Sequence, residues 1–325
     1  MSKDATENQL EEYPDVFVDI FNNLILEGHG VLKEDSLTPM TLRAYTRKTD
    51  GRIRSGMRDV CKRMNSNEVF HLICGIENQT EIDNTMPERV MGYEYAGYEE
   101  QIKQIMDQNK IRKKTAGSRR IFWKQKLTPV VTGVLYYGEK KWNHPKRLHD
   151  MLQFPDADKE ILKRYVADYP MNLVQVAHLT KEERERLTSD FRIVAEYLAC
   201  RNDKEKWNQF LKNTKEIRHI EELLDVIWEL SGDEHYLILK EKVKGRKTRK
   251  EKWTMCEMTK ELIRIGREDG IQTGVQTGIQ TGVIAMIRDN LDMGNEKESI
   301  LEKLVKYFSI TMESAVNYYN QVVTE

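Results

Sequence analysis

Residues 57–79 read MRDVCKRMNSNEVFHLICGIENQ and contain the clearest β-structure pattern in the N-terminal half of the chain. Two strand-length runs, 57–64 and 69–76, flank an Asn-Ser-Asn sequence at 65–67 that has the composition of a turn. Two such runs on either side of a turn predict an antiparallel β-hairpin. The hairpin is therefore the first part of a predicted sheet.

The segments around the hairpin predict a mixed α/β domain. Pro14–Leu26 has the apolar spacing of a short helix, and Pro87 opens a second helix that runs to about Met106. Residues 127–137 are rich in Val and Thr and predict a strand, and residues 172–179 predict another. The order of helix, strands, helix, strand and strand gives a mixed α/β domain of roughly 180 residues.

The remainder of the chain has a helical pattern. Residues 266–282 carry a glycine at every fourth position, which predicts either a low-complexity linker or a helix stabilised by close packing of its small face. Residues 298–323 predict two short amphipathic helices. The expected parts are a flexible N-terminus at 1–12, the α/β domain at 13–180, a helical extension at 181–265, and the Gly-repeat segment with C-terminal helices at 266–325.

The composition argues against export and against a membrane span. The 325 residues are 39% hydrophobic, which is enough for a sizeable core. Residues 1–12 lack the basic start and the apolar run of a signal peptide, and no stretch reaches the length of apolar sequence that a membrane helix needs. The four cysteines form no CxxC pair, which argues against a disulfide framework or a zinc knuckle. These features predict a cytoplasmic protein.

The charges nearly cancel, with 52 basic and 53 acidic residues, but they are not evenly mixed. Residues 43–63, 110–126 and 240–252 each contain eight Lys or Arg and at most two acidic residues. Basic runs are usually solvated surface. Beside a reactive site, however, they suit binding to the phosphates of a nucleic acid.

Two carboxylates and an amide define a candidate site in the hairpin. Glu77 and Gln79 are two residues apart on one strand, so their side chains project to the same side. If Ser66 is the centre of the turn, Asp59 faces Ile73, and Glu77 lies on the same face farther along the strand. Converging carboxylates repel each other and normally need a cation, and their oxygens suit Mg²⁺ or Mn²⁺. By spacing alone, the alternative that both are solvated surface charges is favoured.

Four sequence motifs follow one another in the N-terminal half. Residues 57–60 read MRDV, residues 73–80 read ICGIENQT, residues 86–93 read MPERVMGY, and residues 127–139 read LTPVVTGVLYYGE. In this order they resemble the signature of the Rpn-type recombination-promoting nucleases, also called the YhgA-like putative transposases. The sequence Asp15-Val16-Phe17 with Phe21 also fits the family's opening helix, so the resemblance covers about residues 13–180.

This family belongs to the PD-(D/E)XK nuclease superfamily, so the resemblance implies a restriction-endonuclease-like core in which helices flank a mixed central sheet. It also implies a metal-dependent DNA endonuclease, and the basic runs beside the site predict low sequence specificity. By the same resemblance Asp59 and Glu77 would be catalytic metal ligands, and the backbone carbonyl of Asn78 would be a third ligand. Gln79 would stand where the superfamily usually has Lys; Gln can orient a water molecule by hydrogen bonding but adds no positive charge.

Basic residues near the site are candidate contacts to DNA. Arg89 and Tyr93 are four residues apart on a predicted helix and share a face. They would either approach the scissile phosphate or support the metal site, or else serve as a surface charge and a packing residue. Contacts to phosphates give affinity with little sequence reading and weaken with salt. The candidate nucleic-acid-binding residues are Arg58, Arg89, Arg112, Lys113, Lys114, Arg119, Arg120 and Lys124.

Two other functions stay open. The glutamine at position 79 and the unknown separation of Asp59 and Glu77 also suit a DNA-binding or assembly protein whose nuclease site is weak or inactive. An RNA nuclease would use the same residues. Cutting both strands of a duplex generally needs two sites, so a homo-oligomer such as a dimer is expected. No nucleotide cofactor is expected, because the sequence has no GxxxxGK[ST] motif.

Overall fold

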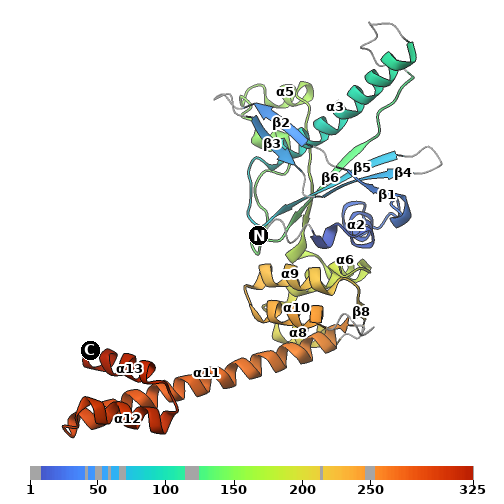
Figure 1. Cartoon of the computed structure of the whole chain (residues 1–325). Helices are drawn as coiled ribbons and strands as arrows, with labels where there is room; N and C mark the ends of the chain where they lie inside the picture. Colours follow the sequence, from blue (N-terminus) through green and yellow to red (C-terminus); the bar gives the residue numbers. More distant parts are fainter. Residues whose placement is uncertain are drawn as a thin grey trace. The chain divides into compact units, whose positions relative to one another are not determined.

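The computed structural model describes residues 9–40, 43–47, 53–57, 60–65, 71–113, 124–212, 215–245 and 253–324 (Figure 1). Its contacts divide the chain into two compact units, Met1–Glu257 and Met258–Glu325. The finer division expected from the sequence, with boundaries at 12, 180 and 265, stays a prediction.

A five-stranded mixed sheet forms the centre of the first unit. The strand order is β1-β4-β5-β6-β7. Adjacent strands among β1, β4 and β5 are antiparallel, whereas adjacent strands among β5, β6 and β7 are parallel. Two short strand pairs, β2 with β3 and β8 with β9, lie outside this sheet. The mixed α/β class expected from the sequence is confirmed. The strands are β1 (Leu37–Pro39), β2 (Arg43–Arg47), β3 (Ile53–Met57), β4 (Val60–Asn65), β5 (His71–Gln79), β6 (Val130–Tyr136), β7 (Asn172–Gln175), β8 (Glu216–Ile217) and β9 (Trp253–Thr254).

Helices cover both faces of β5, which is buried from residue 72 to residue 78. On one face, Cys61 and Ile73 form an apolar cluster against which Tyr98 of α3 (Met86–Lys113) packs. On the other face, the ammonium group of Lys62 lies over the ring of Phe17 in α2 (Pro14–Ile20), 5.3 Å from its centroid. Figure 1 shows α2 and α3 on opposite sides of the sheet. The sheet is therefore the middle layer of three.

The expected elements are present with shifted ends. A π-helical turn at Phe21–Ile25 continues α2, so the helical segment ends one residue before Leu26, the end predicted from the sequence. The helix expected to end near Met106 continues to Lys113, because Gln, Lys and Arg in its last turns are good helix formers. The last expected strand is shorter than predicted: β7 ends at Gln175, and Val176–His178 forms a 3₁₀ turn.

The register of the hairpin differs from the sequence prediction. Arg63, and not Asp59, is the partner of Ile73, so the pairing is shifted by four residues. Residues 66–70, between the two strands, lie outside the described residues. Turn composition identified the hairpin but could not determine which residues pair. In the observed register Val60, at the start of β4, pairs with Ile76, the residue before Glu77.

Short helices lie between β6 and β7 and after β7 in the first unit, and two buried carboxylates join the later ones: Asp19 links α2 to the start of α7, and Asp190 links the start of α7 to the segment before α9. Asp19 accepts hydrogen bonds of 2.7–3.1 Å from the backbone N–H groups and hydroxyls of Thr188 and Ser189. Asp190 accepts from the backbone N–H groups of Arg218 and His219 at 2.9 and 2.7 Å. The helices are α4 (Leu148–Met151), α5 (Lys159–Tyr165), α6 (Lys181–Arg186), α7 (Phe191–Cys200), α8 (Lys204–Phe210), α9 (Ile220–Ser231) and α10 (His235–Gly245).

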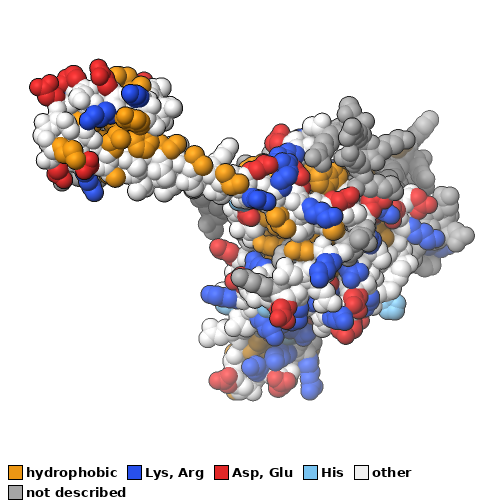
Figure 2. Space-filling model, turned by 90° about the horizontal axis from the view of Figure 1, so that it is seen from below, with side chains coloured by type: hydrophobic (Ala, Val, Ile, Leu, Met, Phe, Trp, Pro, Cys, Tyr) orange, Lys and Arg blue, Asp and Glu red, His pale blue; other side chains and the backbone are white. Residues whose placement is uncertain are grey.

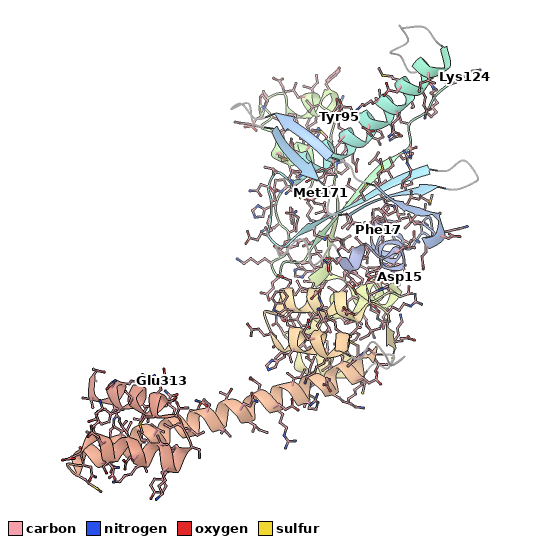
Figure 3. The ribbon with its side chains drawn as sticks, in the orientation of Figure 1. Asp15, Phe17, Tyr95, Lys124, Met171 and Glu313 are labelled. Carbon is pink, nitrogen blue, oxygen red and sulfur yellow. The ribbon has the colours of Figure 1, made fainter. Side chains whose placement is uncertain are left out.

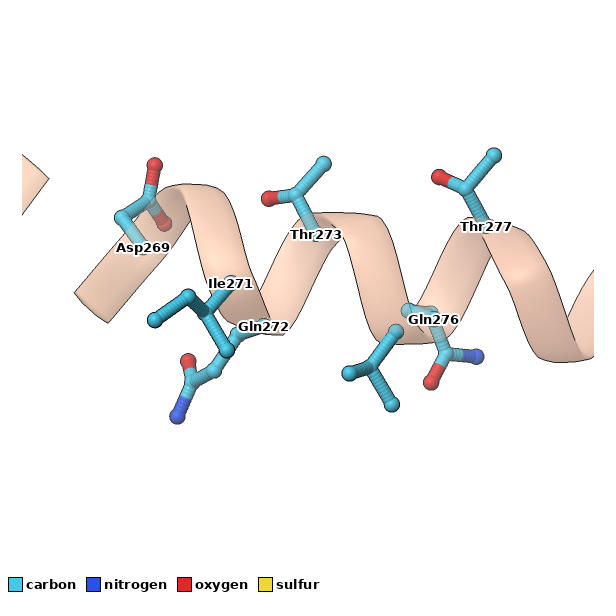
Figure 4. A pocket seen from close by; sticks show the side chains of 7 residues that line it. Asp269, Ile271, Gln272, Thr273, Gln276 and Thr277 are labelled. Carbon is cyan, nitrogen blue, oxygen red and sulfur yellow. The ribbon is translucent and has the colours of Figure 1, made fainter. Parts of the chain in front are cut away.

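The glycine repeat is helical and lies within α11 (Met255–Asp292). Residues 270–278 are exposed along this helix, and the side chains shown in Figure 4 all come from it. Close packing of a glycine is found only at Gly282 among the described residues of the repeat, where an added Cβ would lie 2.9 Å from the ring of Phe308. The repeat is therefore helical and not a linker without secondary structure, but the close packing of its small face that was expected to stabilise the helix is absent at Gly266, Gly270, Gly274 and Gly278.

The two amphipathic helices expected after the repeat are confirmed as α12 (Lys297–Phe308) and α13 (Met312–Thr324). Their apolar faces and the end of α11 enclose a core of their own, which includes Val283, Ile287 and Leu304. In the view of Figure 2, Lys and Arg side chains lie among Asp and Glu side chains over the described surface of the first unit. Much of the predicted basic runs at 43–63 and 110–126 falls outside the described residues.

We expect Asp19→Asn to lower the free energy of unfolding of the first unit by about 3 kcal/mol, because an amide nitrogen would face N–H donors that the carboxylate now satisfies. Urea unfolding followed by tryptophan fluorescence measures the change. Asp35→Asn, at an exposed carboxylate, is the matched control and should change stability by less than about 0.5 kcal/mol. Equal stabilities of the two variants would contradict a joining role for Asp19.

Candidate functional site

The candidate site lies at the carboxyl end of β5, which ends with Glu77, Asn78 and Gln79. The carbonyl of Gln79 accepts a hydrogen bond from the backbone N–H of Tyr137 at 2.9 Å, which fixes the strand end against the end of β6. Residues 80–85 then lead into α3, whose first turns return over the strand end. Sites form commonly at the carboxyl ends of parallel strands, because loops and helix starts converge there.

Glu77 is almost fully buried, with 2% of its surface exposed. Its Oε1 atom forms an ion pair with Arg89, whose Nη2 atom donates to it. The same oxygen lies 3.3 Å from the Gln79 amide nitrogen and 3.3 Å from the Tyr93 hydroxyl. Arg89 and Tyr93 contact each other at 3.1 Å, so the predicted shared helix face exists and is directed at Glu77. The alternative that Glu77 is a solvated surface charge is wrong.

Arg89 also bridges Glu77 to the loop before α3. Its Nη1 atom donates to Asp83 at 2.8 Å. Burial by itself would lower the pKa of Arg89, but the charge of Glu77 and the hydrogen bonds to Tyr93 and Asp83 raise it overall, so the guanidinium stays charged. Burial likewise would raise the pKa of Asp83, but hydrogen bonds from Thr85 and Arg89 hold it below its ordinary value. The site is thus a chain of alternating charges, Glu77, Arg89 and Asp83.

Two oxygens that were predicted to be metal ligands both accept a hydrogen bond from one atom, the amide nitrogen of Gln79. The Gln79 amide nitrogen donates to the backbone carbonyl of Asn78 at 2.6 Å as well as to Glu77 Oε1. A carboxylate oxygen and a carbonyl oxygen are therefore directed at a common point beside β5. Both are hard oxygen donors of the kind that Mg²⁺ and Mn²⁺ prefer, so this donor set fits such an ion.

The opposite face of the same strand end holds a residue that the sequence interpretation missed. Glu11, 1% exposed, accepts a hydrogen bond from the Asn78 side-chain amide at 2.9 Å and from the Tyr137 hydroxyl at 2.7 Å. Residues 9–11 are helical, and Leu10 is buried beside Glu11. One leucine among acidic residues was the only sequence signal that this segment packs on the sheet. Glu11 anchors the side chain of the residue whose carbonyl points to the site.

The other predicted site residues are not gathered at Glu77 by the described structure. Arg112 and Lys113 end α3, about 35 Å along the helix axis from Arg89. Lys124 lies beside that far end of α3, whereas Tyr95 lies near its start (Figure 3). Within the described residues, no three His, Cys, Asp or Glu side chains are placed to hold a metal ion together. Five predicted residues lie outside the described residues: Arg58, Asp59, Lys114, Arg119 and Arg120.

A family model described as "Putative transposase, YhgA-like" matches residues 50–224, which is more than half of the chain. The matched range includes β4, β5, α3 and the ion pair of Glu77 with Arg89. The family expected from the four motifs is thereby confirmed. Comparisons with curated proteins and with solved structures found no match. None of the helices in the described parts of the chain has the length and apolar character needed to cross a membrane.

We expect Arg89→Met to lower the free energy of unfolding by about 3–5 kcal/mol, because it leaves the buried charge of Glu77 without its partner. Adding Glu77→Gln to this variant removes that charge and should restore a large part of the loss. Urea unfolding followed by tryptophan fluorescence is a suitable measurement, since Trp142 lies in the same apolar cluster as Tyr93.

The control is Arg164→Met, at an exposed arginine of α5, which should be nearly neutral. A double variant that is no more stable than Arg89→Met alone would mean that Arg89 does not compensate the charge of Glu77.

Proposed function

Because the chain belongs to the YhgA-like putative transposase family, we propose that it is a metal-dependent DNA endonuclease that hydrolyses phosphodiester bonds with low sequence specificity. The observation that carries the proposal is the convergence of Glu77 Oε1 and the Asn78 carbonyl on the Gln79 amide nitrogen. A buried carboxylate and a strand carbonyl that share one point are the donor pair that the resemblance to PD-(D/E)XK nucleases implies.

The sheet supports a PD-(D/E)XK core for the first unit. An antiparallel hairpin is followed by a helix and a parallel strand, and helices flank both faces. Asp59 would be the second carboxylate. It directly precedes Val60 in the sequence, and Val60 pairs with Ile76, the residue before Glu77. This register favours Asp59 as a partner of Glu77 more than the register expected from turn composition.

Asp59, Glu77 and the carbonyl of Asn78 would hold Mg²⁺ or Mn²⁺, and the bound ion would polarise the phosphodiester and make a water molecule a better nucleophile. The chain itself would orient the reactants. Gln79 has an amide that can hold a water molecule by hydrogen bonding, but it supplies no charge. Glu11 would keep the Asn78 peptide in place through its contact with the Asn78 side chain.

The contacts of Arg89 with Glu77 and Asp83 would allow it to bind a phosphate of the DNA. A divalent cation and the Arg89 guanidinium would compete for Glu77 Oε1, because both are bound by the same oxygen. Asp83 holds Arg89 through its other terminal nitrogen at 2.8 Å. If the contact with Glu77 is released, Asp83 would keep Arg89 at the site with Nη2 directed to a DNA phosphate, the kind of anion for which a guanidinium is well suited.

A second function, a DNA-binding or assembly protein with a weak or inactive nuclease site, is favoured by one observation. The ion pair with Arg89 already compensates the charge of Glu77 without a metal ion. In this alternative, Glu77 and Arg89 serve stability alone. DNA is the proposed partner in both functions, and a homo-oligomer in the cytoplasm is the proposed form of the protein, since cleavage of both strands needs two sites.

We expect the purified full chain to nick supercoiled plasmid when Mg²⁺ or Mn²⁺ is present and not when EDTA is present. Glu77→Gln and Asp59→Asn should reduce nicking to the level seen with EDTA, because each removes a proposed ligand. Gln79→Ala should slow nicking by about 10- to 100-fold, the usual effect of losing a group that orients a ligand or water. Gel electrophoresis of nicked and linear plasmid measures the rates.

Glu81→Gln, an exposed acid two residues beyond Gln79, is the control and should cut like the wild type. Wild-type protein that nicks no faster than Glu77→Gln would contradict the nuclease and favour the binding alternative. A labelled RNA of the same sequence, tested in parallel, separates a DNA nuclease from an RNA nuclease: faster cleavage of the RNA would overturn the choice of DNA.

A further inference from the structure

A polar hollow of about 600 Å³ opens beside α4 and α5 in the first unit, away from the residues around Glu77. Its volume is within the range of small-molecule and nucleotide sites. None of the residues predicted from the sequence as DNA contacts lies in it. The residues of its wall that matter here are Arg147, His149, Gln153, Phe154, Lys159 and Lys163.

The wall of the hollow has an excess of positive charge. Arg147 and Lys163 each have an acidic neighbour, Asp168 at 3.0 Å and Glu160 at 3.6 Å, but Glu160 is 84% exposed and its pair with Lys163 is correspondingly weak. Lys159 forms no ion pair with any residue that the structure describes. Asp150 is the one carboxylate in the lining of the hollow, against three cations. Since Asp168 compensates Arg147, the excess of positive charge rests on Lys159 and Lys163, and these two lysines favour an anionic ligand.

An aromatic ring and a side-chain amide lie beside these cations. The ring of Phe154 packs edge-on against His149, with 5.3 Å between ring centroids, and His149 is held in turn by the backbone carbonyl of Val166 at 2.8 Å. Gln153 is exposed in the lining and presents an amide that can donate and accept hydrogen bonds. A rigid aromatic ring, an amide and a group of cations together match the parts of a nucleotide: base, base edge and phosphate.

The hollow is connected to the candidate site through the loop before α3. His144, three residues before Arg147, is hydrogen-bonded to Asn84 at 2.6 Å, and Asn84 is next to Asp83, the partner of Arg89. The backbone N–H of Leu148 donates to the carbonyl of Tyr169 at 3.0 Å, and the Tyr169 hydroxyl binds Glu94 on α3. These contacts tie the segment around the hollow to α3 and to the loop that carries Asp83.

We propose that the hollow binds an unpaired nucleotide of the DNA strand next to the cleaved bond, with the phosphate on Arg147, Lys159 and Lys163 and the base against Phe154 and Gln153. The proposal rests on the proposed function for the identity of its ligand as DNA. A base within an intact duplex can enter such a hollow only if it is flipped out of the stack, which costs a few kcal/mol, whereas an unpaired base does not have this cost. The ligand that we propose is therefore a single-stranded overhang or flap.

The test is fluorescence anisotropy of the full chain in EDTA, where no cleavage is expected, with a labelled duplex that carries a short single-stranded overhang and with the same duplex made blunt. Lys159→Ala/Lys163→Ala should weaken binding of the overhang DNA about 10-fold or more and lower the salt dependence of its affinity by about 1.4, the value for two phosphate contacts on a single strand. Lys181→Ala/Lys206→Ala, which removes two exposed lysines elsewhere, is the matched control and should bind like the wild type.

Phe154→Leu and Gln153→Ala should weaken binding of the overhang DNA but leave binding of the blunt duplex unchanged. Three results would overturn the inference: equal overhang binding by the Lys159→Ala/Lys163→Ala variant and its control, an equal loss on blunt duplex, or displacement of the overhang by micromolar deoxynucleoside monophosphate, which would identify a free nucleotide as the ligand. If the protein nicks plasmid but gives one of these results, nucleotide binding in the hollow is refuted and the proposed nuclease activity is not. If the protein binds overhangs through the hollow but does not nick plasmid, the nuclease activity is refuted and nucleotide binding is not.

Discussion

The negative charge of Glu77 has to be compensated at the end of a strand whose two faces are both covered. A carboxylate removed from water costs several kcal/mol unless an opposite charge and hydrogen bonds replace the water. Arg89 supplies that charge, and Asp83 holds Arg89 from the other side. The loop before α3 and the first turns of this helix are therefore fixed relative to β5. The ion pair thus fixes the start of α3 over the sheet, while hydrogen bonds from the Thr132 backbone N–H to Glu94 and from the Thr128 backbone N–H to Gln101 hold the helix farther along.

The need for a cation beside Glu77 connects the stability of the folded protein with the proposed metal-dependent cleavage of DNA. Glu77 needs a cation whether or not the protein is a nuclease, and either a guanidinium or a divalent ion can meet that need. The Asn78 peptide next to it is held independently, because the Asn78 side chain binds Glu11 on the opposite face of the strand. A change of cation at Glu77 would thus leave the second proposed ligand, the carbonyl of Asn78, in its place.

The local elements and the family were predictable from the sequence, whereas contacts between distant elements were not. Two strand-length runs and the turn residues between them identified the hairpin, and the motif around Glu77 and Gln79 identified the site, because both signals are contiguous in sequence. The register could not be deduced, since turn composition does not determine which residues pair. Glu11 was missed because its burial depends on the partners Asn78 and Tyr137, which are 67 and 126 residues away along the chain.

A crystal structure of the chain grown with MnCl₂ and a short DNA, with diffraction data collected for the anomalous signal of manganese, tests directly whether a metal ion replaces Arg89 at Glu77. We expect a manganese peak at about 2.1 Å from a Glu77 carboxylate oxygen and from the Asn78 carbonyl oxygen, with the Arg89 guanidinium moved from Glu77 to a DNA phosphate. A structure with DNA bound, no manganese at these oxygens and the ion pair of Arg89 with Glu77 intact would contradict it.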